Sequence, residues 1–290
     1  MPTAFAEYEN SLEDIVDLDE FPIHLLANRR RAELVAETRS QMDTVGCCRI
    51  SDFIRPEAVE AMRIEAESLH DQTHWANSDH NPYASAEDVS FPEGHPRRSF
   101  QHRSSGFINS DLLTERSMLR RIYDSDVVLH FVWECLGVDR PIYRWADTVG
   151  RNPYGAMEPG HTFPWHFDGN EFTVSVLVQR PEGGGVFEYV PDIRTPDAEN
   201  YERVQAVLEG GRDGVHELDL MPGDLQLFKG RFSMHRVTTV EGTIPRYVGL
   251  PTYVHDPYRM NRPFHSRNYY GVSTDLHEQR AQVVVDGLED

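Results

Sequence analysis

Residues 164–172 are PWHFDGNEF. In an extended strand successive side chains point to opposite faces, so His166 and Asp168 share one face and Phe167 lies on the other. An imidazole and a carboxylate on one face are close enough to bind the same metal ion, and Gly169 lets the chain turn away without crowding that ion. A His-x-Asp triplet by itself is weak evidence, because a surface histidine beside a surface aspartate is the commoner outcome.

A second histidine and an arginine follow in MPGDLQLFKGRFSMHRVTTVEGTIPRYVGLPTYV, residues 221–254. His235 opens a strand, and Arg246 comes eleven residues later. With His235 as the third ligand, two histidines and one carboxylate would occupy one face of a metal ion, and three adjacent positions would stay open. Non-haem Fe(II) oxygenases need this arrangement to bind a bidentate co-substrate and dioxygen. Taken singly, His235 could be a satisfied core histidine and Arg246 a surface residue, but the ordered set favours the oxygenase.

Arg246 fits the same chemistry. A 2-oxoglutarate molecule that chelates iron through its keto group and one carboxylate has a second carboxylate, which a guanidinium can bind with two parallel hydrogen bonds. A buried arginine without an anion would be costly. Thr252 has the same parity as Arg246 along the chain, so both would face the interior of a barrel. We therefore expect Arg246 to bind 2-oxoglutarate and Thr252 to hydrogen bond into the pocket, although threonine is also common in strands for its shape.

The C-terminal half has the pattern of an antiparallel sandwich or barrel. Short strand-like runs are separated by Gly, Pro and Asn/Asp turns: IYRWADTVG, FTVSVLVQ, GVFEYV, VHELDL, DLQLFKG, HRVTTV and RYVGLPTYV. One helix, NYERVQAVLEGG, is predicted between them. We expect a mainly β, cupin-like jelly-roll core over about residues 141–260, followed by a C-terminal extension over 261–290.

The N-terminal half is predicted to be helical and to pack on this core within one domain, residues 21–290. The predicted elements are an acidic, loosely packed arm (1–20), an amphipathic helix (21–42), a short strand (46–54), a helix that starts at Pro56, a long loop (71–106) and a helix near 111–136. Loops as long as 71–106 are usually functional or disordered, and a lid over the site is one role for it.

Composition narrows the classes of partner. A formal net charge of −20 would repel nucleic acid and anionic membranes. No apolar run approaches the length of a membrane span, and the acidic N-terminus lacks the features of a secretory signal. The three cysteines, Cys47, Cys48 and Cys135, are too few for a disulfide framework. We therefore predict a cytoplasmic protein with a small-molecule substrate.

With these residues in place, the sequence resembles the Fe(II)/2-oxoglutarate-dependent oxygenases from about Trp145 to Tyr253. The segment GCCRISDFIRPEAVEAM looks like the strand-then-helix start of the phytanoyl-hydroxylase-like branch. The segment PWHFDGNEFTVSVLVQRPEGGGVFEYVPDIR is similar to the branch that contains radical halogenases of free amino acids, such as the lysine halogenase, and their hydroxylase relatives. The resemblance implies a double-stranded β-helix, with Fe(II), 2-oxoglutarate and O2 as reactants and succinate and CO2 as products.

The same resemblance distinguishes two activities. Halogenases of this type have Gly or Ala where this chain has Asp168, which leaves a coordination position for chloride. A carboxylate there excludes the halide, so the resemblance implies hydroxylation of an unactivated C–H bond.

Candidates for substrate binding are less distinct. Arg97, Arg98 and Arg103 lie close together in an otherwise acidic sequence, and one of them could bind a substrate carboxylate or simply neutralise acidic surface. The narrower resemblance favours Arg103. Asp147 and Glu171 could receive a substrate ammonium, although ordinary strand-end carboxylates explain them nearly as well. Together they would suit a free amino acid, including a basic one such as lysine.

Two other classes of function stay open from the sequence. A cupin-like hydrolase or isomerase would use zinc or manganese on the same three ligands, but it would leave Arg246 without an anion. A non-catalytic binding module would use the pocket only to hold a ligand. A halogenase is the nearest mechanistic alternative, and Asp168 is the residue that argues against it.

Overall fold

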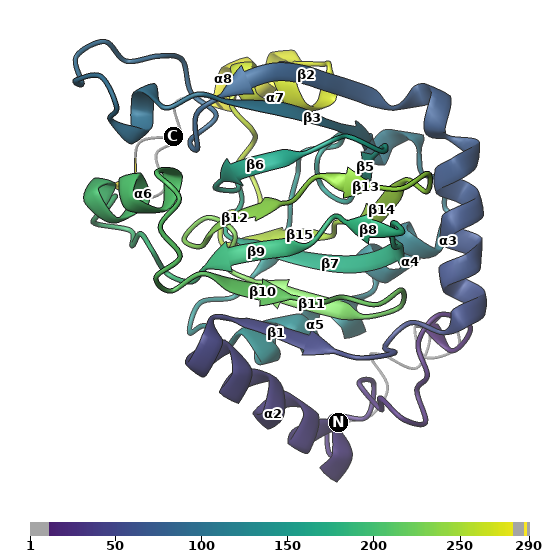
Figure 1. Cartoon of the computed structure of the whole chain (residues 1–290). Coiled ribbons are helices and arrows are strands. Elements are labelled where there is room, and N and C mark those ends of the chain that lie inside the picture. The colour runs from purple at the N-terminus through teal and green to yellow at the C-terminus, as the bar shows by residue number, and fades with distance from the viewer. Residues whose placement is uncertain (1–11, 281–286, 289–290) are drawn as a thin grey trace.

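Two antiparallel β-sheets face each other in the structure, a computed structural model that describes residues 12–280 and 287–288 (Figure 1). The larger sheet has the strand order β1 (Cys47–Ile50), β11 (Leu225–Phe228), β7 (Phe172–Gln179), β14 (Arg246–Gly249), β5 (Tyr154–Met157), β3 (Gln101–Ile108) and β2 (His74–His80), and β15 (Thr252–Val254) pairs with β7 and with β4 (Tyr143–Arg144). The smaller sheet has the order β10 (His216–Leu218), β9 (Phe187–Val190), β12 (Met234–Val237) and β6 (Phe163–His166). A short pair is formed by β8 (Gly183–Gly184) and β13 (Val240–Glu241). The predicted antiparallel jelly-roll core is therefore confirmed.

Helices and 3-10 turns accompany the sheets. Their bounds are α2 (Arg29–Val45), α3 (Pro56–Ser68), α4 (Met118–Asp124), α5 (Asp126–Leu136), α6 (Tyr201–Leu208), α7 (Pro263–Tyr270), α8 (Asp275–Arg280), η1 (His70–Gln72), η2 (Pro96–Arg98) and η3 (Ser110–Leu112). The side chain of Asn28 caps α2, and Gly46 ends it with φ 68°. Because Asn28 supplies the cap, this helix begins later than the predicted range 21–42. The predicted helix starting at Pro56 is confirmed as α3.

Strand β7 shows how the two faces of the larger sheet differ. Its side chains alternate, so Val174 and Val176 join the apolar core, whereas Thr173 and Ser175 line a cavity between the two sheets. Helix α3 packs against β7. The alternation therefore places polar side chains on the face that a small molecule inside the barrel would contact.

The first described residues belong to the core, which corrects the prediction of a loosely packed arm over 1–20. Ile15 and Val16 are fully buried, and Val16 forms a β-bridge with Ile54. The apolar side chains of this stretch lie between carboxylates, so no periodicity revealed them. The part of the arm before Leu12 lies outside the described residues.

The prediction of a long loop over residues 71–106 is wrong. Strands β2 and β3 pair along their whole length, and β3 also pairs with β5, so both extend the larger sheet at the top of Figure 1. The connection between them is only residues 81–100. It is held by Asn81, whose side-chain amide donates a hydrogen bond to the Arg97 carbonyl at 2.9 Å. Many His, Asn and Ser side chains concealed these strands, because their stabilisation comes from pairing with neighbours rather than from an apolar face.

Two further elements differ from the prediction. The strand predicted over 142–150 is limited to β4, because the Asp147 side chain accepts hydrogen bonds from two following backbone N–H groups and so forms a turn. The helix predicted near 111–136 is divided at Ser125 into α4 and α5. The helix predicted within the strand region is confirmed as α6.

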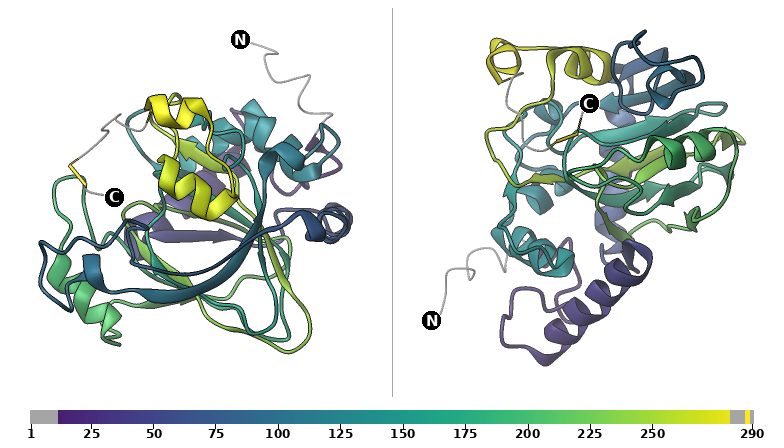
Figure 2. Two further views of the ribbon diagram at one scale, coloured as in Figure 1. Left: turned by 90° about the horizontal axis from the view of Figure 1, so that it is seen from above. Right: turned by 90° about the vertical axis from the view of Figure 1, so that its left-hand side faces the viewer.

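The C-terminal helices pack onto the end of the barrel. Helix α7 contacts β2 and β3, with α8 following it (Figure 2). Tyr269 and Tyr270 of α7 cluster with Phe107 of β3. The segment predicted only as an extension therefore covers part of the cavity between the sheets. No helix in the described part of the chain is both long and apolar enough to cross a membrane.

Candidate metal centre

Three predicted ligands converge at one end of the smaller sheet. His166 ends β6 and is the register partner of His235 in the adjacent β12, and Asp168 follows β6 by two residues. The Oδ1 atom of Asp168 lies 3.8 Å from His166 Nε2 and 3.4 Å from His235 Nε2. Ligand atoms of all three lie within 4.8 Å of one another, and no other group of His, Cys, Asp and Glu among the described residues is arranged to hold a metal ion.

Backbone carbonyls orient both histidines. The Nδ1 atom of His166 lies 2.8 Å from the Pro164 carbonyl, and that of His235 lies 2.9 Å from the Ser233 carbonyl. A carbonyl only accepts, so each Nδ1 carries the proton and each Nε2 presents a lone pair to the centre. Burial lowers the pKa of His166, which keeps its imidazole neutral, as a metal ligand must be.

Asp168 is held as a carboxylate with one oxygen free for the centre. Burial acts to raise its pKa, but the interaction with His235 and the hydrogen bond from Thr173 outweigh this and lower the pKa of Asp168. The Thr173 hydroxyl donates to Asp168 Oδ2 at 2.6 Å. A side chain at Gly230 would collide with the same Oδ2, and the Gly230 carbonyl accepts the Asp168 backbone N–H. These contacts leave Oδ1 facing the two imidazoles.

Thr173 provides a test of this arrangement. Replacing Thr173 with valine preserves the shape of the side chain but removes the hydrogen bond to Asp168 Oδ2, so we expect Co(II) or Fe(II) affinity to fall by about tenfold. Replacing Thr173 with serine keeps a hydroxyl and should retain most of the affinity. Anaerobic metal titration measures both. Equal affinities for the two variants would show that the hydroxyl does not position the carboxylate.

Arg246 lies in the same cavity. Its side chain projects from β14, is only 6% exposed, and lines the cavity together with the three candidate ligands. Its guanidinium has no ion pair or side-chain hydrogen bond within the described part of the chain. Burial lowers the pKa of Arg246 to about 10, which still leaves it charged at neutral pH. Gly185, at φ 61°, makes room for it, because a Cβ there would lie 3.2 Å from Arg246 Cδ.

The other predicted residues are divided between the cavity and the scaffold. Thr252 lines the cavity and donates its hydroxyl to the Arg151 carbonyl at 2.7 Å. Arg103 is fully buried beside residues of the cavity wall. Arg97 and Arg98 lie elsewhere: Arg97 stacks on Tyr83, and Arg98 donates to Glu87.

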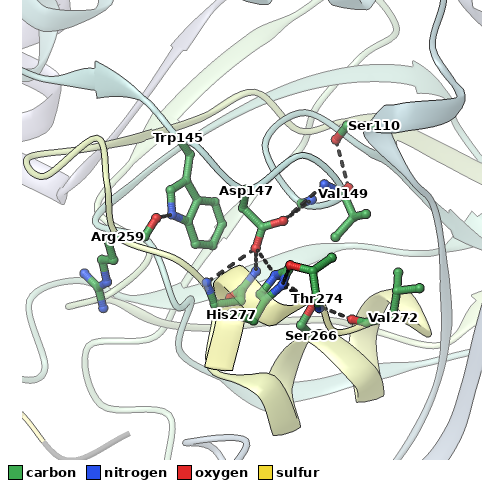
Figure 3. A network of polar contacts seen from close by, with 11 residues as sticks. Ser110, Trp145, Asp147, Val149, Arg259, Ser266, Val272, Thr274 and His277 are labelled. Atoms are coloured by element: carbon green, nitrogen blue, oxygen red, sulfur yellow. Dashed lines mark hydrogen bonds and ion pairs between the residues drawn. The ribbon is translucent and has the colours of Figure 1, made fainter. Parts of the chain in front are cut away.

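The structure does not place Asp147 in the cavity, which corrects its assignment as an acceptor for a substrate ammonium. Figure 3 shows its carboxylate surrounded by donors. Oδ1 accepts from the Val149 and Gly150 backbone N–H groups, both at 3.1 Å. Oδ2 accepts from Asn261 Nδ2 at 3.0 Å and lies 3.1 Å from His277 Nε2. Asp147 therefore fastens the C-terminal segment to the barrel.

Glu171 is corrected in the same way. Its Oε1 accepts from Arg259 Nη1 at 2.8 Å, and Glu171 lines a different surface depression from the metal cavity. A strand-end carboxylate that reaches the cavity and one that pairs with a distant arginine look identical in sequence.

Four residues of the C-terminal segment line the cavity and were not predicted: Asn261, His265, Tyr269 and Tyr270. Burial lowers the pKa of His265 to about 3, so its imidazole is neutral at pH 7. Pro263 in the first turn and Gly271 at the end of α7 are helix signals, and His265 and Tyr269 at i and i+4 share one helix face. Those signals could have predicted the helix, but not that it packs over the site.

The Asp147 network predicts a pH-dependent contribution to stability. Replacing Asp147 with asparagine would turn an NH2 group toward the donors of Asn261 and His277, so we expect a loss of about 2 kcal/mol at pH 7. Burial acts to raise the pKa of Asp147, but the hydrogen bonds from His277 and from the Val149 and Gly150 backbone N–H groups outweigh this and lower it. Its contribution is therefore present above the unfolded pKa of about 4 and is lost as pH falls through and below that value.

Urea denaturation across this pH range measures the effect. The difference in the free energy of unfolding between wild type and Asp147→Asn should narrow on acidification. The exposed Asp219→Asn is the control and should change stability little. If this difference in unfolding free energy stayed constant down to acid pH, Asp147 would not be ionised in the folded protein.

Comparison with family models matches residues 30–262 to the family "Halogenase D". The match covers most of the chain. The protein belongs to the Halogenase D family. No curated protein matches the sequence.

Solved structures share the fold at low sequence identity. A prolyl hydroxylase from Trichoplax adhaerens, solved with a hypoxia-inducible-factor peptide, has TM-score 0.52 and 16% identity, covering 78% of this chain and 91% of its own. The carbocyclase SnoK of nogalamycin biosynthesis, described as non-haem and α-ketoglutarate-dependent, has TM-score 0.52 and 13% identity, with coverages of 77% and 85%. HygX from Streptomyces hygroscopicus, solved with nickel, 2-oxoglutarate and hygromycin B, has TM-score 0.50 and 16% identity, with coverages of 75% and 86%. The fold is thus the one used by 2-oxoglutarate-dependent oxygenases.

Proposed function

We propose that the protein is an Fe(II)- and 2-oxoglutarate-dependent hydroxylase that oxidises an unactivated C–H bond of a small molecule. The observation that supports this most directly is the position of Arg246, a buried arginine without an anion in the cavity that the ligand triad also lines. The donor set of two imidazoles and one carboxylate suits Fe(II) with open coordination positions. A zinc hydrolase on the same triad would leave the Arg246 charge uncompensated.

The chain's own residues have separate tasks in this reaction. His166, Asp168 and His235 would hold the metal, and Arg246 would bind the far carboxylate of 2-oxoglutarate. When bound, Fe(II) with 2-oxoglutarate and O2 would supply the oxidising power, and succinate and CO2 would be the co-products. The apolar side chains of the cavity, including Phe163 of β6, would exclude water and hold one substrate carbon near the centre.

Hydroxylation rather than halogenation is supported by Asp168. Its Oδ1 already lies on the side of both Nε2 atoms, and Thr173 and Gly230 hold it there. A halide would need the coordination position that this oxygen would take. The family name alone therefore does not argue for halide chemistry in this chain.

A free amino acid is the substrate class that we propose. Arg103, buried at the cavity wall, supports recognition of a carboxylate. The two carboxylates considered for the ammonium of a basic amino acid, Asp147 and Glu171, are engaged elsewhere. The preference for lysine therefore loses its support.

Two measurements test the proposal. Anaerobic addition of 2-oxoglutarate to the Fe(II)-loaded protein should produce the charge-transfer absorption of a chelated keto acid. In air, one of the proteinogenic amino acids or a derivative should stimulate succinate formation and yield a product heavier by one oxygen atom. A chlorinated product in the presence of chloride would instead establish a halogenase. Absence of the absorption would favour a metal-dependent enzyme that does not use 2-oxoglutarate.

A further inference from the structure

Arg246 borders two separate spaces. One is the metal cavity, and the other is a surface depression of about 300 Å³, which is at the lower end of the sizes of small-molecule pockets. Among the described residues, Phe187 is the only other one that lines both spaces. The side chains of Arg246 and Phe187 therefore form the partition between the metal cavity and the surface of the protein at this place.

The depression lies at the end of the barrel away from the candidate metal ligands. Thr173, near the start of β7, contacts Asp168, whereas Leu177 on the same face of the same strand lines the depression. Four residues of a strand span roughly 13 Å. Figure 1 shows the same separation, with the β8–β13 pair beside the depression at the right and the end of β6 that carries His166 at the left.

The outer wall beside Arg246 is built from backbone without side chains. Gly184 and Gly185 line the depression, and both have φ 61°, a conformation that favours glycine. A Cβ at Gly185 would lie 3.2 Å from Arg246 Cδ and 2.8 Å from Pro181 Cγ. A side chain at this position would press on the arginine and narrow the depression. Glycine therefore keeps Arg246 open to approach from the surface.

The metal end of the cavity is partly covered by the C-terminal segment, which is firmly attached there. Figure 3 shows Asp147 holding this segment through Asn261 and His277. Farther along, Asn109 Nδ2 donates a hydrogen bond to the Tyr270 carbonyl at 2.9 Å. The substrate has to reach the metal at this end, so a co-substrate that used the same entrance would have to exchange through the space that the substrate occupies.

The shape of 2-oxoglutarate also suits an approach from behind Arg246. In the bound orientation its far carboxylate lies at Arg246, and its keto acid end reaches the metal. A molecule that moves inward past Arg246 with the keto acid end first arrives in this orientation without turning round in the cavity. From the metal end, the same molecule would have to pass the three candidate ligands with its far carboxylate first.

We propose that 2-oxoglutarate enters, and succinate leaves, through the depression behind Arg246, whereas the substrate uses the metal end. Arg246 and Phe187 move aside during this exchange. The inference rests on the proposed function, because it takes Arg246 as the residue that binds 2-oxoglutarate. An obstruction on this path would raise the barrier for entry and for exit equally and would leave the bound state unchanged. Both rate constants should then fall, while their ratio, the Kd, stays the same.

A removable obstruction tests this path. Leu218 is half-buried and lines the depression, and the three native cysteines are buried. A bulky, uncharged methanethiosulfonate should therefore react with Leu218→Cys at the new thiol alone. The Fe(II)-loaded protein is mixed with 2-oxoglutarate in an anaerobic stopped-flow instrument. The concentration dependence of the rate at which the charge-transfer absorption forms gives kon and koff, and equilibrium titration gives the Kd independently.

Labelling of Leu218→Cys should lower kon and koff together by about tenfold, with the Kd within about twofold of that of the unlabelled variant. Reductive removal of the label should restore both rate constants. Val186→Cys places the same label at a second position of the depression and should behave alike, which keeps the test informative if Leu218→Cys folds poorly. Asp79→Cys carries the label on an exposed part of β2, outside both spaces, and is the matched control.

The outcomes separate the inference from the proposed function. Unchanged rate constants in both labelled variants, or an equal slowing in labelled Asp79→Cys, would overturn the inference while the proposed function stands. A Kd that rises with kon unchanged would also overturn it, because the label would then disturb the bound state rather than the path. If the absorption does not form in the unlabelled protein, the proposed function fails and the inference fails with it.

Discussion

Asp168→Ala is expected to lower the affinity for Fe(II) or Co(II) by at least about 100-fold and to abolish substrate-dependent succinate formation. The reason is geometric, because Asp168 supplies the only carboxylate among the three converging side chains. Its loss also leaves the Thr173 hydroxyl without its acceptor, which adds a small cost in stability. Anaerobic metal titration and a succinate assay measure the two effects separately.

A control and a rival explanation accompany this variant. Asp79 is exposed and pairs only with His102 on the surface, so Asp79→Ala should leave metal affinity unchanged. If Asp168→Ala bound metal as tightly as the wild type, the triad would not be the metal site. If ligand binding in the cavity were unaffected as well, a non-catalytic binding module would be the better account.

Arg246→Met is expected to weaken 2-oxoglutarate binding by about 3 kcal/mol, or roughly 100-fold, with metal affinity unchanged. The guanidinium is buried, charged and without a protein anion, so it would form strong paired hydrogen bonds with the far carboxylate. Arg246→Lys should lose less affinity for 2-oxoglutarate, because an ammonium keeps the positive charge but cannot make the two parallel hydrogen bonds of a guanidinium. Titration of the charge-transfer absorption with 2-oxoglutarate gives both affinities.

Stability supplies an independent check on Arg246. Without 2-oxoglutarate the arginine is an unpaired buried cation, so Arg246→Met should unfold at the same or a higher temperature than the wild type. With saturating 2-oxoglutarate the wild type should gain more stability than the variant. Arg180→Met, which removes an arginine that pairs with Asp219 at the surface, is the matched control. An unchanged 2-oxoglutarate affinity in Arg246→Met would show that the co-substrate binds elsewhere or not at all.

The candidate ligands could be predicted because their spacing reflects local geometry. In β6 and the residues after it, alternation alone places His166 and Asp168 on one face. Strand β7 shows the same rule, since its valines face the core and Thr173 faces the cavity. Pairing between β6 and β12 then brings His235 opposite His166.

Other features could not be predicted because they depend on partners far away in sequence. Strands β2 and β3 are polar segments stabilised by pairing with each other and with β5, so no apolar pattern distinguished them from a loop. Asp147 was equally ambiguous. Whether its carboxylate meets a substrate or His277 depends on where a helix more than a hundred residues later packs.

The sequence by itself determined the jelly-roll class, the His166–Asp168–His235 set and Arg246, because strand periodicity and chain order specify which side chains share a face. Only the tertiary structure decided the charge of the cavity, since that depends on which ionised groups find partners. Asp147 and Glu171 accept hydrogen bonds from Asn261 and Arg259, whereas Arg103 and Arg246 have no carboxylate partner among the described residues. Compensation of a buried charge is a property of its surroundings in space, so packing rather than local pattern sets it.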